Sequence, residues 1–360
     1  MDKRTNTARW IESAGRWQIN VQRDGRRRSF YSSTPGRKGQ REANAKADAW
    51  LVDGIEKAGR RVSELYAEYI ASQKESTSRS HWRGVVSRYN THIGPQIGHK
   101  RIDKLTEQDL QDIINRAYAR QGLAAKTLGN IRADLVSFLR FCRRANAATL
   151  TPEGLTIPAS AKRPQKSVVL PADLLKLFNV ETTLFRGKRV PEPYIHAFRL
   201  EVLTGLRPGE IAGLTWPDVC RGEIHLHQAI NYFGEITQGK NKNAVRCVVL
   251  SALAAAELEA QREITGGEAS VFAISSQQTY YKHWLRYLAS NDMKRVTPYE
   301  LRHTFVSIAK QLPEGMVKSI VGHSQSMDTF GVYGHEIEGD ASETAERINS
   351  IFTGLLGRNG

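Results

Sequence analysis

The chain has 360 residues, a formal net charge of +15 and a mean hydropathy of −0.46. This length allows two or three domains that each bury a core, and the basic excess suggests a polyanionic partner. The sequence contains no apolar run long enough to span a membrane and no signal-peptide core, which argues against membrane-embedded and secreted classes. We therefore expect a cytosolic protein.

Cysteine usage and motif content bear on cofactors. Cys142, Cys220 and Cys247 lie far apart without a Cys-x-x-Cys spacing, a pattern that supports neither a disulfide framework nor a zinc site. A Walker loop and paired metal-binding carboxylates are also lacking. We expect no cofactor and no metal.

The positive charge is concentrated in the first 166 residues. Residues 1–61 contain 15 Lys and Arg against 7 Asp and Glu, and residues 62–166 contain 17 against 9, whereas residues 167–360 contain 20 against 21. The first two segments are therefore the candidates for gripping a polyanion.

Residues 1–60 are predicted to form a three-stranded sheet packed on one helix. Apolar and polar residues alternate along 17–22, Asp24-Gly25 is a strong hairpin signal, and a helix with an apolar face follows from about Arg41. An arginine run on a twisted ribbon favours nucleic-acid binding over a solubilising hairpin. The candidate residues are Arg23, Arg26, Arg27 and Arg28.

Residues 61–148 show apolar spacing typical of four helices. Candidates for phosphate contacts on them are Arg79, Arg83, Arg88, Lys126 and Arg132, although a solvated helix position is the simpler interpretation of each one. Residues 149–166 contain three prolines and a basic end, which predicts a linker along which Lys162 and Arg163 could follow a nucleic-acid backbone.

Residues 167–360 are predicted to form an α+β domain, mostly helical with one three-stranded patch around 223–250. Arg207 precedes Pro208 at the start of a predicted helix, where backbone N–H groups favour a phosphate. Glu210 reads as a capping residue that orients Arg207. The stretch 236–250 reads as a hairpin that carries Lys240 and Lys242.

The stretch 297–335 carries the densest signals. Pro298 and Glu300 mark a helix start at Thr297, and the apolar spacing leaves Tyr299 and Arg302 together on a face beside the core. His323 follows in a turn, and Tyr333 comes ten residues later. A phenol held near arginines suits nucleophilic attack on a phosphodiester, because a guanidinium can bind two phosphate oxygens at once.

In their order, these residues resemble the pattern of the tyrosine recombinases, or phage integrases. The members of the pattern are Arg207, the hairpin lysine, Tyr299, Arg302, His323 and Tyr333. The string 92–111 resembles the family's helical core-binding domain, and residues 9–57 resemble its arm-site-binding domain. The resemblance implies a mostly helical, multidomain fold with a catalytic domain of the tyrosine recombinase type.

The resemblance also implies a function, that of a site-specific recombinase of a phage or integrative element. Tyr333 would form a 3′-phosphotyrosyl link, with Arg207, Arg302 and His323 stabilising the transition state. Lys242, or else Lys240, would protonate the leaving 5′ oxygen. The implied partners are double-stranded DNA at attachment sites, further copies of the chain in a homotetramer, and accessory bending or directionality factors at the nucleoid of a bacterial host.

Two points depart from this pattern or stay open. Tyr299 stands where the family has a histidine, and because a phenol has an ordinary pKa of about 10, we expect it to donate a hydrogen bond rather than act as a base. The apolar residues of 341–355 predict a helix that packs either on its own domain or on a neighbouring protomer.

Two alternative functions are a type IB topoisomerase-like enzyme and a DNA-binding regulator of weak catalytic activity.

Overall fold

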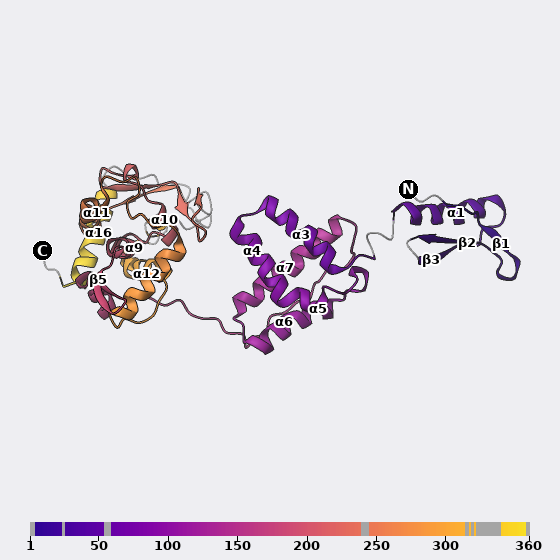
Figure 1. Cartoon of the computed structure of the whole chain (residues 1–360), viewed down its shortest axis with the longest axis horizontal. Helices are drawn as coiled ribbons and strands as arrows, with labels where there is room; N and C mark the ends of the chain where they lie inside the picture. Colours follow the sequence, from indigo (N-terminus) through magenta and orange to yellow (C-terminus); the bar gives the residue numbers. More distant parts are fainter. Residues whose placement is uncertain are drawn as a thin grey trace. The chain divides into compact units, whose positions relative to one another are not determined.

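A computed structural model describes residues 4–23, 26–53, 59–238, 245–313, 317, 320–321 and 340–357. The chain divides into two compact units, Met1–Pro164 and Gln165–Gly360, whose helices and small sheets are drawn in Figure 1. The predicted fold class is confirmed, since the described chain is mostly helical and begins with a three-stranded sheet. Within these ranges no helix combines the length and apolarity that crossing a membrane requires.

The N-terminal sheet is antiparallel with the order β1-β2-β3, and one helix covers it. Its core includes Ile19, Ala43 and Ala47, each at most 2% exposed. The helix begins at Gly36, earlier than the expected position near Arg41, and its Glu42 carboxylate accepts hydrogen bonds from the hydroxyl groups of Ser32 and Thr34. The elements are β1 (Arg9–Ile11), β2 (Arg16–Arg23), β3 (Arg26–Ser32) and α1 (Gly36–Asp53).

The helical bundle that follows has its own core, built around Leu65, Tyr66 and Phe138. A π-helical turn, Tyr89–Ile93, joins its second helix to a short third one. The four predicted helices are present, with this short helix added. They are α3 (Val62–Ser76), α4 (Arg79–Arg88), α5 (Gly94–Ile97), α6 (Glu107–Gln121) and α7 (Ala125–Arg144).

Much of the segment 147–162 lies along this bundle. Leu155 and Ala161 are buried in its core, and Thr156 N–H donates to Gln111 Oε1 over 2.9 Å. The carbonyl of Lys162 accepts from Ala125 N–H at the start of α7 over 2.9 Å. The backbone of this proline-containing stretch is thus fixed by the helices before the chain reaches the second unit.

The second unit is built around α9, whose residues are buried along nearly its whole length between α11 and α13. A small antiparallel sheet has the order β10-β7-β6. The helices are α8 (Pro171–Asn179), α9 (Ile195–Thr204), α10 (Pro208–Gly213), α11 (Ala252–Thr265), α12 (Gln277–Ser290), α13 (Tyr299–Ile308) and α16 (Asp340–Leu355). The sheet strands are β6 (Val219–Cys220), β7 (Glu223–Leu226) and β10 (Arg246–Val249).

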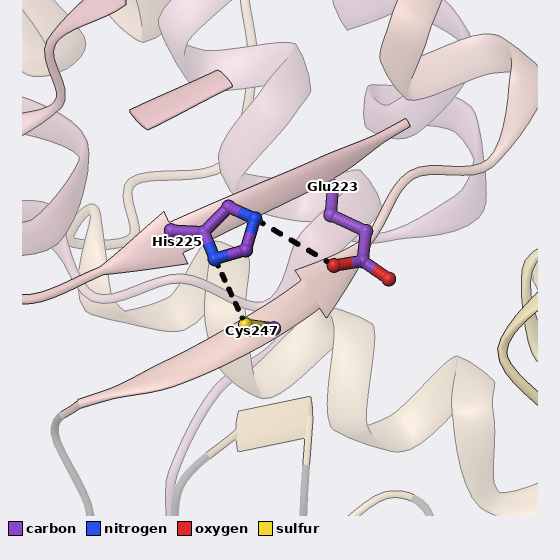
Figure 2. Close-up of side chains that lie close together, drawn as sticks. All are labelled: Glu223, His225 and Cys247. Atoms are coloured by element: carbon purple, nitrogen blue, oxygen red, sulfur yellow. Dashed lines mark hydrogen bonds and ion pairs between the residues drawn. The ribbon is translucent and has the colours of Figure 1, made fainter. Parts of the chain in front are cut away.

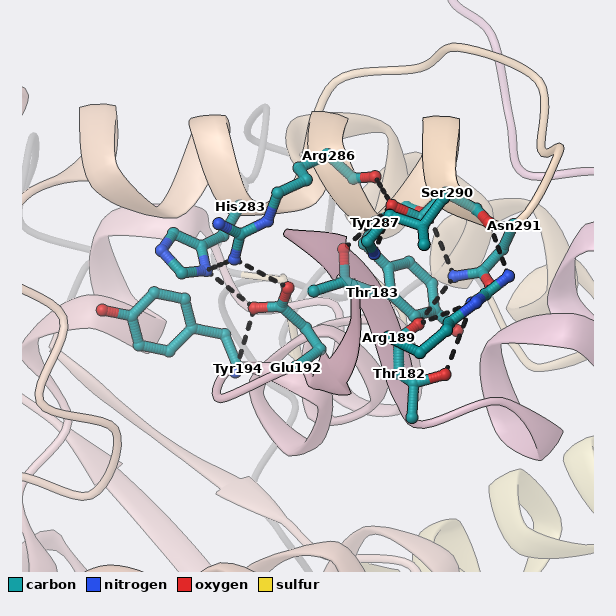
Figure 3. Close-up of polar contacts among 11 residues, drawn as sticks. Thr182, Thr183, Arg189, Glu192, Tyr194, His283, Arg286, Tyr287, Ser290 and Asn291 are labelled. Atoms are coloured by element: carbon teal, nitrogen blue, oxygen red, sulfur yellow. Dashed lines mark hydrogen bonds and ion pairs between the residues drawn. The ribbon is translucent and has the colours of Figure 1, made fainter. Parts of the chain in front are cut away.

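Two further ribbons were not expected from the sequence. One pairs β8 (Ala229–Ile230) with β9 (Ile236–Thr237), and the other pairs β4 (Thr182–Phe185) with β5 (Lys188–Pro191). Figure 3 shows the second ribbon held against α12. Arg189 donates to Asn291 Oδ1 over 2.6 Å and to the Ser290 carbonyl over 2.8 Å. Just after β5, the fully buried Glu192 carboxylate lies within 2.8 Å of the His283 ring and 3.3 Å of Arg286.

The C-terminal helix α16 packs on its own domain, which is one of the two arrangements left open by the sequence. Ile348 and Phe352 are in the core, where the Phe352 ring stacks with that of Phe305 at a centroid distance of 6.4 Å. Asn349 Oδ1 accepts a 3.0 Å hydrogen bond from Leu253 N–H at the start of α11.

Candidate active site

A tight turn between α9 and α10 positions Arg207. Gly205 ends α9 with a positive φ of 67°, and a Cβ at this position would lie 2.4 Å from Cδ1 of Phe305. Both the backbone conformation and the lack of space therefore require glycine. Two residues later Arg207 occupies the N-cap of α10, as the Pro208 signal predicted.

Glu210, in the first turn of α10, organises two arginines. Its carboxylate accepts from the Arg207 backbone N–H at 2.8 Å and from the Arg207 guanidinium at 2.7 Å. Arg246 binds the same carboxylate with both terminal nitrogens, each at 2.9 Å. Burial alone would raise the pKa of Glu210, but the hydrogen bond and charge of Arg246, together with Arg207, hold that pKa below its usual value. Glu210 is therefore ionised and orients both side chains.

Arg302 is the most deeply buried of these cations, with 1% of its surface exposed. It donates to the carbonyl of Gly205 over 2.7 Å and to the carbonyl of Val321. Burial and the neighbouring Arg207 and Arg246 charges lower the pKa of Arg302 to about 10, against the opposing effects of Tyr299 and Glu210. The group stays charged at neutral pH, and its hydrogen bonds go to neutral carbonyls rather than to a carboxylate.

Arg246 was not among the residues predicted from the sequence. Its Nε donates to the carbonyl of Ile320 over 2.8 Å, while Arg302 binds the next carbonyl, that of Val321. These two carbonyls immediately precede Gly322-His323 in the chain. The only sequence signal for Arg246 is a cation at the start of a short apolar strand, which is common on protein surfaces.

Tyr299 lies one turn before Arg302 on α13 and is 42% exposed. Its ring meets the ring of His303 edge-on at a centroid distance of 5.1 Å. The phenol therefore remains accessible beside the arginines, and His303 supports it from within the same helix.

Four of the predicted catalytic or hairpin residues lie outside the described residues. They are Lys240, Lys242, His323 and Tyr333. In the sequence, the described chain ends at Val321, two residues before His323, and it resumes at Val245, three residues after Lys242. The structure thus brings together Arg207, Tyr299 and Arg302 of the predicted set and adds Arg246 and Glu210.

The predicted DNA-binding residues of the first unit divide into three groups. Arg88 binds the buried carboxylate of Asp134 through two hydrogen bonds of 2.5 and 3.1 Å, which favours a structural role. The side chains of Arg23 and Arg26 lie outside the described residues, although their backbones pair in the hairpin. The remaining candidates are exposed: Arg27, Arg28, Arg79, Arg83, Lys126, Arg132, Lys162 and Arg163.

Chemically, the cluster of Arg207, Arg246 and Arg302 is an anion site. Arg207 and Arg246 bind the ionised carboxylate of Glu210, and Arg302 lies close enough to feel the charges of all three, so positive charge is in excess in a largely buried place. An oxyanion such as a phosphodiester would compensate that charge.

Two models of known protein families match this chain. Residues 175–338 match the phage integrase family, and residues 62–118 match the phage integrase N-terminal SAM-like domain; together these matches cover more than half of the chain. The chain belongs to the phage integrase family of tyrosine recombinases. The match of the integrase domain includes Arg207, Arg302, His323 and Tyr333 within its bounds.

Individual relatives of this integrase-family chain are distant in sequence. The ICEBs1 integrase of Bacillus subtilis is 22% identical over 313 residues, which cover 80% of this chain and 82% of the relative. The prophage integrase IntR of Escherichia coli is 23% identical over 267 residues, covering 64% of this chain and 62% of the relative.

Solved structures with the same fold include integrases bound to DNA. The Tn1549 transposon integrase, in complex with transposon right end DNA, has a TM-score of 0.62 at 19% identity, covering 80% of this chain and 99% of that one. A lambda integrase tetramer bound to a Holliday junction has a TM-score of 0.60 at 17% identity, with 94% of this chain and 99% of that one covered. At these identities the likeness concerns the fold.

Proposed function

We propose that this integrase-family chain is a site-specific recombinase of a phage or integrative element, which cuts and rejoins DNA through a 3′-phosphotyrosyl intermediate on Tyr333. The observation that carries the proposal is the excess of buried positive charge at Arg207, Arg246 and Arg302 around the single carboxylate of Glu210. Such a site stabilises a pentacoordinate phosphorane more than the bound phosphodiester, because negative charge on the non-bridging oxygens grows in the transition state.

In the cleavage step, the Tyr333 hydroxyl loses its proton to solvent, its oxygen attacks the scissile phosphorus, and the bond from phosphorus to the 5′ oxygen breaks. Arg207, Arg302 and His323 stabilise the negative charge on the non-bridging oxygens. Lys242, with Lys240 as the other candidate, gives the leaving 5′ oxygen its proton. Religation reverses these transfers with a 5′ hydroxyl from the partner duplex, so the energy of the phosphodiester is conserved and no nucleotide cofactor is needed.

Tyr299 takes the place of the second histidine of the family pattern, and we assign it a hydrogen bond to a non-bridging phosphate oxygen. Its exposure beside buried Arg302 supports this role. A phenol can donate such a bond at any pH below its titration.

The first unit would hold the duplex through its exposed basic residues, with the sheet carrying Arg27 and Arg28 on an arm site and the helical bundle on the core site. We further propose a homotetramer on paired sites, as the lambda integrase forms on a Holliday junction. Accessory bending or directionality factors at the nucleoid complete the proposed assembly.

The test is covalent trapping of the cut DNA. The full chain is incubated in EDTA, without ATP, with supercoiled plasmid that carries the DNA flanking its own gene, and a denaturation-resistant protein–DNA adduct is expected. Tyr333→Phe should bind the same DNA and yield no adduct. Tyr232→Phe is a matched control, because this exposed tyrosine lies outside the cluster and should leave the adduct unchanged.

A second duplex in the reaction separates recombination from simple relaxation. Joined products between the two duplexes are expected from a recombinase, whereas relaxation of the plasmid without exchange would indicate a topoisomerase-like enzyme. An adduct that persists in Tyr333→Phe would refute the assigned nucleophile.

A further inference from the structure

A second group of chemistry-bearing side chains lies on the outer face of the sheet β10-β7-β6, apart from the arginine cluster. Cys247 on β10 is directly opposite His225 on β7, and Glu223 is two residues before His225 on the same strand. Because side chains alternate along a strand, all three lie on one face, while Ile224 and Val248 point to the core and are at most 1% exposed.

The three side chains approach one another closely, as Figure 2 shows. Cys247 Sγ lies 3.1 Å from Nδ1 of His225, and Nε2 of the same ring lies 3.7 Å from Glu223 Oε2. One ligand atom from each residue lies within 4.8 Å of the other two. In a tetrahedral zinc site with bonds of 2.0–2.3 Å, neighbouring ligand atoms are about 3.3–3.8 Å apart, so the group needs only a small contraction to hold an ion.

We propose that Glu223, His225 and Cys247 form a binding site for a divalent zinc ion. Thiolate, imidazole and carboxylate are the three ligand types that zinc accepts, and a cysteine ligand disfavours magnesium and calcium, which prefer oxygen. Water occupies the fourth position. On binding, the Cys247 thiol proton leaves to solvent and a sulfur–zinc bond replaces the sulfur–hydrogen bond, so no oxidant or reductant takes part.

The site has room for the one adjustment that it requires. The His225 ring faces Cys247 with one nitrogen and Glu223 with the other, so it must turn about its Cβ–Cγ bond to present a single nitrogen to the ion. The His225 side chain is 47% exposed and that of Glu223 is 34% exposed, which leaves both free of packing restraints on this face. The antiparallel pairing of β7 and β10 fixes the distance between the backbones of His225 and Cys247 while the ring turns.

This proposal revises the expectation that the cysteine pattern supports no zinc site. That expectation rested on spacing along the chain, and Cys247 is 22 residues from His225. The strand pairing brings the two face to face, which a local motif such as Cys-x-x-Cys cannot reveal. Cys247 also follows Arg246 directly, so an ion here would fasten β10 to β7 next to the residue that binds Glu210.

Cobalt substitution of the full-length protein tests the site independently of DNA cleavage. The protein is stripped with chelator, kept reduced with a phosphine, and titrated with Co²⁺. One equivalent should give the visible bands of a tetrahedral ion and a thiolate-to-cobalt charge-transfer band, and Zn²⁺ should abolish both. Zinc should also raise the thermal midpoint, because a ligand that binds only the folded state stabilises it.

Variants decide which residues bind the ion. Cys247→Ser and His225→Ala should lose the charge-transfer band, and Glu223→Gln should weaken cobalt binding. Cys220→Ser is the matched control, since Cys220 is an exposed thiol on the neighbouring strand opposite Glu223 and should keep the full signal. Absence of the band in the unaltered protein, its persistence in Cys247→Ser, or its loss in Cys220→Ser would overturn the proposal.

Discussion

Arg246 connects three parts of the candidate site through one guanidinium. Its two terminal nitrogens bind both oxygens of Glu210, and its Nε binds the carbonyl of Ile320. Only 8% of the side chain is exposed. It thus ties α10, which begins at Arg207, to the backbone just before His323. Lysine could not replace it, because a single ammonium cannot reproduce this fork.

We predict that Arg246→Met slows DNA cleavage by about 10- to 100-fold, because small displacements of positioned groups are costly in rate. Affinity for the DNA should change little, since Nε and both terminal nitrogens of Arg246 bind protein groups, which makes it a positioning residue within the cluster. The measurement is single-turnover formation of the covalent adduct, together with binding of the same duplex by Tyr333→Phe and Tyr333→Phe/Arg246→Met proteins.

Arg221→Met provides the control for the loss of one arginine, because this residue is exposed in the turn between β6 and β7. It should cleave at the unaltered rate. If Arg246→Met cleaves equally fast, or if its defect is wholly one of DNA binding, Arg246 does not position the site. Arg246→Lys should restore little of the rate, which separates loss of geometry from loss of charge.

Glu201 is a buried carboxyl group beneath the same site. It is fully buried on α9, where its Oε2 accepts a 2.8 Å hydrogen bond from the Tyr280 hydroxyl and its Oε1 has no partner among the described residues. Burial raises the pKa of Glu201 well above its ordinary value, although Tyr280 and the Arg302 charge act in the opposite direction. The folded chain therefore holds this proton more tightly than the unfolded chain does.

This difference predicts a pH dependence of stability with a definite sign. Below pH 4.5, the ordinary pKa, both states are protonated; above it the unfolded chain releases the proton while the folded chain keeps it, so stability falls with rising pH up to the raised pKa. Glu201→Gln keeps the shape and removes the titration. Its thermal midpoint relative to the unaltered protein should therefore rise from pH 5 to pH 8, and its free energy of unfolding relative to that protein should rise by at most about 1.4 kcal/mol per pH unit.

Glu257→Gln is the control for the Glu201→Gln substitution, because it makes the same change at a carboxylate that has ionic partners, His196 and Arg199. Gln261→Glu would not serve, because it adds a charge. A midpoint difference for Glu201→Gln that stays constant or shrinks between pH 5 and pH 8 would show that Glu201 is ionised in the folded protein.

At the scale of elements, the sequence predicts the helices and strands whose start or turn is marked by residues next to one another in the chain. Pro208 and Glu210 mark the start of α10, and Pro298 and Glu300 mark the start of α13; in both helices the glutamate accepts from the backbone N–H three residues earlier. The hairpin of β2 and β3 follows from alternation and a turn dipeptide. Each signal involves residues within about four positions of one another, so it can be recognised without knowledge of the tertiary fold.

Elements that depend on distant partners were not predictable in this way. The ribbon of β4 and β5 is held by α12, about a hundred residues later, through Arg189 and Asn291. The carbonyls of Ile320 and Val321 accept hydrogen bonds from arginines on β10 and α13, and no pattern along the chain predicts such pairs. The same reason explains why Arg246 and the face-to-face Cys247 and His225 escaped the sequence analysis, whereas Arg207 and Arg302, which belong to local motifs, did not.

At the scale of the whole molecule, the two parts of the chain differ in net charge. Residues 1–166 carry a net charge of +16, while residues 167–360 contain 20 basic and 21 acidic residues. The second unit nevertheless concentrates cations in one buried cluster. We interpret this division as grip by the first unit through many weak, salt-sensitive contacts, and chemistry by the second through a few fixed ones.

The division predicts how salt affects DNA binding by the full chain. Each phosphate contact contributes about 0.9 to the slope of log affinity against log salt concentration, so Arg27→Ala/Arg28→Ala should flatten that slope by up to about 1.8 on duplex DNA. Arg186→Ala/Lys188→Ala removes the same charge from the exposed turn between β4 and β5 and should leave the slope unchanged. The measurement is fluorescence anisotropy of a labelled duplex over a salt series. Equal flattening by both pairs would mean that affinity follows net charge alone, and the first unit would then have no special part in holding DNA.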